Sequence, residues 1–253
     1  VLLKRIKKKI LSTLPFGNGF SESFQFIQWF VGWALLYLVC RDERIFAAML
    51  LQAGQSISLL EKIKNFDYKL FSKINGEWHN SFFDTFFPFT REAFFWAPLY
   101  FFLVLFVTIN YKKYGWLWVL FLILNVALSD FVSSNLIKEA FFRLRPCHDP
   151  AVAGHLRFLV RYCPVSSGFT SSHAANHFAA AMFIFVTLSK KLNIGKWWAL
   201  IFLWALIPSY AQMYVGVHFP TDILGGIFAG LILGSFVGFI FNKIVFKKAH
   251  LII

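Results

Sequence analysis

Long uninterrupted apolar runs constrain this chain more than any other feature. Five runs of roughly 17–20 residues are each long enough to cross the hydrocarbon core of a bilayer as a helix. They occupy residues 93–110, 114–133, 174–189, 197–213 and 222–242, and a weaker run covers 25–40. The mean hydropathy of +0.62 is too high for an ordinary soluble domain. Because the sequence lacks β patterning, we expect an all-α polytopic membrane bundle of about six helices.

The basic residues account for the formal net charge of +13 and predict the orientation of the runs. They gather in short clusters beside the runs: Lys4, Arg5, Lys7, Lys8 and Lys9; Lys112 and Lys113; Lys190, Lys191 and Lys196; Lys243, Lys247 and Lys248. If these clusters are cytoplasmic, segments 134–172 and 214–222 lie together on the other side. We therefore expect a multi-pass protein of the bacterial inner (cytoplasmic) membrane whose active site faces the periplasm. A nucleic-acid partner is excluded, because the cations are dispersed over loop ends.

Two domains are expected, an N-terminal membrane anchor or extension of unclear role at residues 1–56 and the main membrane domain at 57–253. An uncleaved anchor is favoured over a cleavable signal, because no small-x-small site follows the run at 25–40. Residues 57–76 alternate apolar and charged side chains at helical spacing. This spacing predicts an amphipathic helix at the membrane interface that ends at Gly76. The sequence sets no oligomeric state.

Two of the three cysteines, Cys147 and Cys163, share the expected outer segment. A disulfide between them is favoured if that side is periplasmic, and the alternative is two free thiols. The cysteine and histidine spacing in this segment matches no zinc pattern, so no metal site is expected.

Three groups of polar residues also fall on the expected outer side. The first is a cluster of cations, Lys138, Arg143 and Arg145, of which snorkelling to the membrane surface explains one or two. In the second, Ser171 and Ser172 precede a helix that starts near His173. The unpaired N–H groups of a helix start favour an anion, although small hydroxyl residues can also simply cap the helix.

The third group is His218 and Asp222, four residues apart before the last apolar run. The carboxylate can hold the tautomer of the imidazole and leave its other nitrogen as a base or nucleophile. The alternative is a capping Asp222 with a neighbouring histidine. Cations, a helix start and two histidines on one surface suit a phosphoryl group, with one histidine attacking phosphorus and the other protonating the leaving oxygen.

These residues resemble the type 2 phosphatidic acid phosphatase superfamily, in its membrane lipid phosphatase branch. Its motifs run Lys-x6-Arg-Pro, Pro-Ser-Gly-His and Ser-Arg-x5-His-x3-Asp, and the resemblance covers roughly residues 57–245. The matching residues are Lys138, Arg145 and Pro146 in the first motif, Ser171 and His173 in the second, and His218 and Asp222 in the third.

The chain departs from these motifs at four positions. Thr170 and Ser172 replace Pro and Gly, and Ala211 and Gln212 stand where Ser and Arg are expected. Gln212 removes a cation that should bind phosphate, although its amide can still donate hydrogen bonds. Arg143 is the expected substitute for that cation. We interpret Gln212 as accompanying a shifted substrate preference and not a loss of activity.

The resemblance implies a role for each site residue. The phosphate-binding set is Lys138, Arg145, Ser171, Ser172, Gln212 and Arg143. His218 attacks and forms a phosphohistidine, Asp222 orients it, and His173 protonates the leaving group. The resemblance implies no metal and no other cofactor.

The expected function is therefore hydrolysis of phosphate from a membrane lipid phosphate or diphosphate. The candidate substrates are undecaprenyl diphosphate, phosphatidylglycerol phosphate, phosphatidic acid and lipid A, and the sequence does not choose among them. The alternative is a non-catalytic protein on the same bundle that binds or transports lipid phosphates, for which Gln212 is the argument. A soluble haloperoxidase of the same superfamily is disfavoured by the apolar runs.

Overall fold

The computed structural model describes residues 58–249, and the side chains of residues 58–245. The chain divides into two compact units, Val1–Glu61 and Lys62–Ile253, of which the second is described here. The expected N-terminal anchor, the run at 25–40 and the first basic cluster lie outside the described residues. The expected domain boundary at 56/57 stays a prediction.

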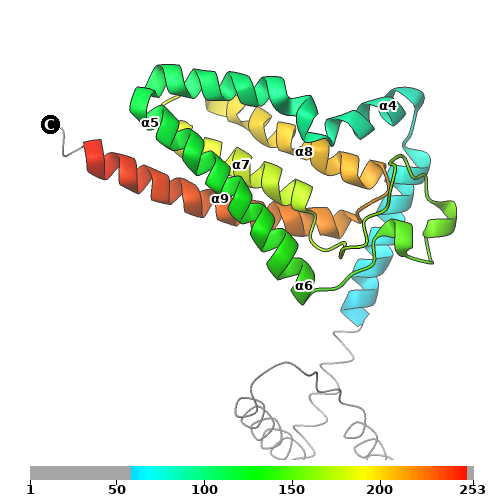
Figure 1. Ribbon diagram of the computed structural model, residues 1–253. Helices are drawn as coiled ribbons and strands as arrows, with labels where there is room; N and C mark the ends of the chain where they lie inside the picture. The colour runs from blue at the N-terminus through cyan, green and yellow to red at the C-terminus, as the bar shows by residue number, and fades with distance from the viewer. Residues whose placement is uncertain (1–57, 250–253) are drawn as a thin grey trace, which may run out of the picture. The chain divides into compact units, whose positions relative to one another are not determined.

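The second unit is built from helices, and residues 58–249 contain no strand. Figure 1 shows α7, α8 and α9 packed side by side, with α5 crossing over them. In chain order the elements are a helical segment at 62–71, η1 (Ser72–Glu77), α4 (Ser81–Thr90), η2 (Ala93–Trp96), α5 (Ala97–Phe131), η3 (Val132–Ile137), α6 (Lys138–Ala140), η4 (Pro146–His148), η5 (Ala153–His155), α7 (Ser172–Leu188), η6 (Gly195–Trp198), α8 (Ala199–Tyr214) and α9 (Pro220–Ala249).

Local sequence signals account for where the main helices begin. The Asn80 side chain caps α4 by accepting a hydrogen bond from the Phe83 amide at 2.9 Å. Proline occupies the first turn of α5 and the first position of α9, where a missing N–H costs nothing. Ser171 caps α7, so the expected helix near His173 begins one residue earlier, at Ser172.

Helix α5 is a hairpin of two helical arms. Its backbone leaves helical geometry at Lys112, where φ is +48°, and the chain folds back on itself (Figure 1). A Cβ atom added to Gly115 would lie 2.4 Å from the carbonyl oxygen of Val107, so only glycine allows the arms to meet this closely. The two arms correspond to the expected runs at 93–110 and 114–133.

The closest contact in the bundle joins α7 and α9. Glycine recurs every fourth residue along one face of α9, at Gly226, Gly230, Gly234 and Gly238. A Cβ at Gly230 would lie 2.3 Å from the carbonyl oxygen of Ala175 on α7, and one at Gly234 would lie 2.4 Å from that of Ala179. The two backbones therefore touch, as they do in small-xxx-small contacts between membrane helices.

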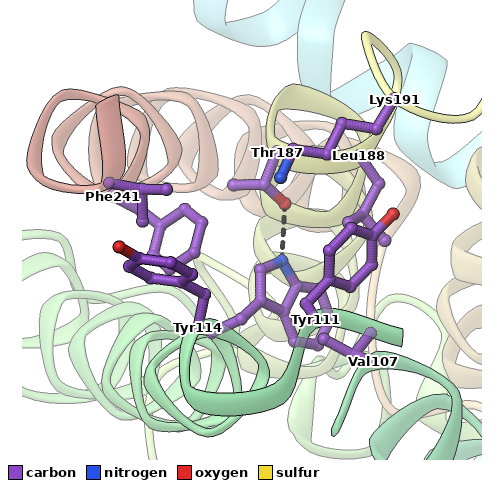
Figure 2. A pocket seen from close by; sticks show the side chains of 9 residues that line it. Val107, Tyr111, Tyr114, Thr187, Leu188, Lys191 and Phe241 are labelled. Carbon is purple, nitrogen blue, oxygen red and sulfur yellow. Dashed lines mark hydrogen bonds between the residues drawn. The ribbon is translucent and has the colours of Figure 1, made fainter. Parts of the chain in front are cut away.

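A small cavity of about 20 Å³ lies where the second arm of α5 meets α7 (Figure 2). There the Trp118 indole donates a hydrogen bond to Thr187 Oγ at 2.7 Å, and the Lys191 ammonium lies 4.7 Å from the centroid of the Tyr111 ring. The volume is room for about one water molecule. We assign this cavity to the packing of the bundle.

Two helical stretches of the described chain, Ala93–Ala140 and Pro220–Val245, are long and apolar enough to cross a membrane. The first includes both arms of α5. Helices α7 and α8 have 17 and 16 residues, fewer than the roughly 20 that a full span requires. The all-α architecture is thus confirmed for the described residues. A total of about six spans and a periplasmic active site stay predictions.

Candidate active site

The three motif segments meet at one end of the bundle and are joined through their backbones. The Ser171 amide, at the start of α7, donates to the Asp222 carbonyl at the start of α9 at 3.0 Å. The His218 amide donates to the Gln212 carbonyl near the end of α8 at 3.3 Å. The first of these bonds joins residues some 50 positions apart, and the Gly168 amide donates to the Arg143 carbonyl at 2.8 Å, which ties the first motif segment to the same end of the bundle.

His218 sits at the centre of this arrangement and is 2% exposed. Its Nε2 lies 3.0 Å from Arg145 Nη1, which can only donate, so Nε2 carries the lone pair. Its Nδ1 lies 3.5 Å from Asp222 Oδ2, long for a hydrogen bond but close enough for electrostatic attraction. This arrangement favours the Nδ1–H tautomer and leaves Nε2 as the nucleophilic atom.

Burial lowers the pKa of His218 to about 4, against the opposing pull of Asp222 and with a smaller lowering from Arg145 and Lys138. The imidazole is therefore neutral at pH 7. A neutral, oriented imidazole is the form that can attack phosphorus.

Asp222 is fully buried, and each of its carboxylate oxygens accepts a hydrogen bond. Its Oδ2 accepts the Phe219 amide at 2.9 Å, and its Oδ1 accepts Arg143 Nη1 at 2.7 Å. Asp222 thus combines both roles considered from the sequence, because it closes the first turn of α9 and faces His218. The backbone bond fixes the carboxylate independently of the imidazole.

Arg143 lies on the far side of Asp222 and forms ion pairs with two carboxylates, those of Asp222 and the fully buried Asp67. Asp67 also accepts the Thr221 amide at 2.9 Å. Two carboxylates neutralise this guanidinium. The structure therefore places Arg143 behind the Asp222 carboxylate, and not as a substitute cation at the phosphate site.

Sequence reasoning missed Asp67, which the segment at 62–77 carries to this network. The segment packs on the chain before α9, where Phe71 lies 5.4 Å from Phe219 between ring centroids. Asp67, Phe71 and Ile74 follow one another at helical spacing and are all buried. A carboxylate in line with an apolar stripe was the available signal, and it was hidden among the exposed charges of an amphipathic helix.

Lys138 and Arg145 differ from Arg143, because neither has a carboxylate within 4.0 Å among the described residues. Lys138 Nζ donates to Ser172 Oγ at 2.8 Å. Arg145 donates from Nε to the Ser166 carbonyl at 2.9 Å, and its other partners are likewise neutral. Two cations held in place without counterions make an anion site.

The hydroxyl of Ser172, where the motif has glycine, organises the lysine side of this anion site. Besides Lys138, its Oγ contacts the hydroxyls of Ser133 at 2.7 Å and Ser134 at 3.0 Å, both on η3. Ser171 is fully buried and its Oγ accepts the Ala174 amide at 3.5 Å, so it caps α7. The serines on η3 are a second contribution that the motifs do not contain.

His173 occupies the first turn of α7, where burial and, to a smaller extent, the positive charges of Arg91 and Lys138 lower the pKa of its imidazole to about 3. It also lines a cavity of about 640 Å³ between α5, α7 and α8. Most of the lining is apolar and includes Leu103, Val104, Val119, Leu122, Ile123 and Val126. The cavity volume is typical of sites for small molecules and lipids, and its polar end is the end at His173.

The loop before α7 carries Cys147 and Cys163. Cys147 and Cys163 form a disulfide with their Cα atoms 6.2 Å apart. Within the described part of the chain, the one cluster of potential metal ligands is this pair with His148, and the disulfide occupies both sulfurs.

With this geometry established, comparison with known proteins identifies the family. The sequence matches the PAP2 superfamily over residues 118–247, which is just over half of the chain. The chain belongs to the PAP2 superfamily. This confirms the resemblance seen in the three motifs.

Two relatives of the chain are bacterial proteins named lipid A 4'-phosphatase. The one from Porphyromonas gingivalis is 36% identical over 115 residues, 46% of this chain and 47% of that protein. The one from Bacteroides thetaiotaomicron is 29% identical over 193 residues, 75% of this chain and 81% of that protein. The chain thus spans about half of the first relative and about four fifths of the second, and both names support the expected class of activity.

A solved structure supports the fold. The crystal structure of a transmembrane PAP2-type phosphatidylglycerolphosphate phosphatase from Bacillus subtilis has a TM-score of 0.51 and 24% identity. The alignment covers 72% of this chain and 87% of that one. This likeness confirms an architecture shared with a membrane protein.

Proposed function

We propose that this PAP2 protein removes a phosphate group from a membrane lipid through a phosphohistidine on His218. The observation that carries the proposal is the position of His173, which lies between a cationic site and an apolar cavity. On one side lie His218 and the cations Lys138 and Arg145, which lack counterions among the described residues. On the other side the apolar cavity of about 640 Å³ begins. A substrate that fills both has a phosphate head and an apolar body.

The proposed reaction has two steps. In the first, His218 Nε2 forms a bond to phosphorus while the bond between phosphorus and the lipid oxygen breaks. His173, whose low pKa the bound phosphate dianion raises, gives that oxygen a proton. In the second, water attacks the phosphohistidine, His173 takes the proton of the water, and inorganic phosphate leaves with the bond to Nε2 broken. Lys138 and Arg145 stabilise the phosphoryl oxygens in both steps, and the Nδ1–H of His218 faces Asp222 throughout.

Lipid A is the first candidate substrate, because both lipid phosphatase relatives described above carry that substrate in their names. The other candidates from the sequence analysis are undecaprenyl diphosphate, phosphatidylglycerol phosphate and phosphatidic acid. Phosphate release by the purified protein should be measured on all four lipids, with EDTA present, because the proposed chemistry uses no metal. Release from none of them would overturn the proposal.

A trapping experiment tests the mechanism. His218→Ala should lower phosphate release by more than about 10³-fold, the scale of losing a covalent nucleophile. His173→Ala, given p-nitrophenyl phosphate, whose leaving group needs no proton, should accumulate a phosphorylated protein that is stable to alkali and labile to acid. His155→Ala, an exposed histidine in η5, is the matched control.

The alternative function is non-catalytic binding or transport of a lipid phosphate. Gln212 favours it, because the side chain is 1% exposed and its Nε2 has no hydrogen-bond partner among the described residues. Retention of a bound lipid phosphate by wild type, with no phosphate release and no effect of His218→Ala, would establish this alternative.

We also propose that the site faces the periplasm of a bacterial inner membrane. The bend within α5 and the connection between α7 and α8 lie at the opposite end of the helices from α6 and the loop before α7 (Figure 1), in agreement with cytoplasmic positive charge. A cysteine introduced at Ala153 should react with an impermeant maleimide in intact spheroplasts, and one at Asn193 only after lysis. The reverse pattern would overturn the orientation.

A further inference from the structure

The phosphate site has one cation fewer than the family motifs provide. Gln212 occupies the position of the third cation and is uncharged. Arg143, the expected substitute, forms ion pairs with Asp67 and Asp222 and is neutralised by them. Of the motif positions, only Lys138 and Arg145 remain to balance a phosphate dianion.

Arg91 brings a further cation to the same place from outside the motifs. It follows α4 directly, and its side chain is only 14% exposed. Together with Ser172 and His173 it lines the polar end of the large cavity. Arg91 is therefore on the substrate's path and beside the residue that protonates the leaving group.

The guanidinium of Arg91 lacks the partners that a structural arginine has. Its Nε is buried and has no hydrogen-bond partner among the described residues. The nearest carboxylate of the described chain is Glu92 at 3.8 Å, and that side chain is 66% exposed, so solvent screens the pair. By contrast, Arg157 at the same end of the bundle donates to Asp84 Oδ2 at 2.6 Å.

The charges around Arg91 point to an anionic ligand. Burial lowers the pKa of Arg91, and it lowers the pKa of Arg145, with Arg91 adding to that effect and Asp222 opposing it. Burial lowers the pKa of His173, and the positive charge of Arg91 lowers it further. Two guanidinium groups that are both desolvated and mutually repulsive are costly unless an anion lies between them.

We propose that Arg91 is a phosphate-binding residue and replaces, from the turn after α4, the cation that Gln212 lacks on α8. This inference rests on the proposed function. It restores three cations around the phosphate, with Lys138, Arg145 and Arg91 contributed by three different parts of the chain. A planar guanidinium can bind two phosphate oxygens at once, which an amide at position 212 cannot do.

The test removes the positive charge at position 91 and then restores a positive charge at position 212. Arg91→Gln should lower kcat/KM on the best lipid of the panel by about 10- to 100-fold, the range for losing a charged hydrogen bond. It should weaken competitive inhibition by inorganic phosphate by a similar factor. Adding Gln212→Arg to Arg91→Gln should recover at least about tenfold of both, because the cation returns at the motif position. Arg161→Gln, an exposed arginine of the neighbouring loop, is the matched control.

The readouts separate the possible failures. An Arg91→Gln protein within twofold of wild type overturns the inference, and so does one that loses activity with unchanged phosphate inhibition. If Arg91→Gln does not fold, Arg91→Lys can replace it, because it keeps the positive charge but loses the planar guanidinium that binds two oxygens. Arg91→Lys should lower both kcat/KM and the affinity for inorganic phosphate several-fold. No loss in this variant would overturn the inference. A wild type that neither releases nor binds phosphate overturns the proposed function, and this inference with it.

Discussion

His218 is enclosed by cations yet keeps a carboxylate beside it, and this combination determines how the imidazole titrates. The pKa of about 4 in the folded protein is below the ordinary value of 6.5. Protonation, which blocks attack, therefore begins only in acid. The imidazole of His218 is therefore unprotonated, the form that can attack phosphorus, at all pH values near neutrality.

The pH dependence of kcat/KM should reflect this. We correct kcat/KM for ionisation of the substrate phosphate. Titration of His218 should then cause no decrease in kcat/KM from pH 8 down to about pH 5, and a decrease below pH 5 as the pH approaches the pKa of His218 in the folded protein. Asp222 raises the pKa of His218, so Asp222→Asn should move the decline to still lower pH while reducing the rate overall. A decline centred near 6.5 in wild type would contradict the burial argument.

Asp67 forms no hydrogen bond or ion pair with His218 in the described part of the chain. It acts on that imidazole through Arg143, Thr221 and Asp222, so we expect it to be a positioning residue. Asp67→Asn should lower kcat by about tenfold with KM within twofold of wild type, because Arg143 loses one of its two carboxylates and holds Asp222 less firmly. Steady-state kinetics and a melting curve check this.

Asp149→Asn is the matched control for Asp67→Asn. It removes the charge of the carboxylate that accepts a 2.7 Å hydrogen bond from Tyr68, on the same helical segment, and so weakens that bond without touching Arg143. Equal losses in the two variants would mean that docking of the segment, and not the orientation of Asp222, was measured.

At the scale of elements, the contact of α7 with α9 holds the site together, because each helix begins beside one of the two histidines. Glycine at every fourth position is what lets the backbones meet. The contact should therefore be intolerant of even one methyl group.

Gly230→Ala should destabilise the bundle, because the new Cβ would lie 2.3 Å from the Ala175 carbonyl oxygen and the helices would have to separate. We expect the free energy of unfolding to fall by about 1–3 kcal/mol, as in other overpacked cores. Thermal melting in detergent measures this. Gly154→Ala, at a position where an added Cβ meets nothing within 4 Å, should melt like wild type.

The elements themselves were largely predictable, because each apolar run has the length and composition of a helix and the lysines at 112–113 mark a turn. What the sequence did not reveal is how the elements meet. The glycine period of α9 passed unnoticed within a long apolar run. Residues 57–76 were predicted as an amphipathic helix at the membrane interface, and the prediction did not include the burial of Phe71 and Ile74 in the structure.

At the scale of the whole molecule, the apolar cavity connects the chemistry to the bilayer. If it holds the body of the lipid, filling it should impair lipid substrates alone. Ala127→Trp adds a large side chain to the cavity wall from the second arm of α5. We expect a rise of about tenfold in KM for the lipid, and unchanged kinetics on p-nitrophenyl phosphate.

Leu124→Trp is the control for this substitution, because Leu124 is on the same arm, is 52% exposed and does not line the cavity. Equal effects of the two tryptophans, or equal effects of Ala127→Trp on both substrates, would argue against a lipid in the cavity.

The convergence of the three motifs on one site was predictable from spacing and topology, because His173, His218, Lys138 and Arg145 all precede or follow runs that end on the same side. The assignment of partners was not. Arg143 and Arg145 are two residues apart in sequence, yet one is paired with carboxylates and the other with neutral groups. That difference depends on Asp67, some 75 residues away, and a single sequence does not record such a choice.

The glycine contact between α7 and α9 also limits how far these two helices can move relative to each other. Because the backbones of these helices touch, their relative position is closely constrained, and with it the positions of the helix starts beside His173 and His218. The large cavity takes most of its apolar lining from the two arms of α5 instead. The groups proposed to react and the surface proposed to hold the lipid therefore belong to different helices, so a substitution in the cavity wall can change which lipid binds while the two histidines stay in place.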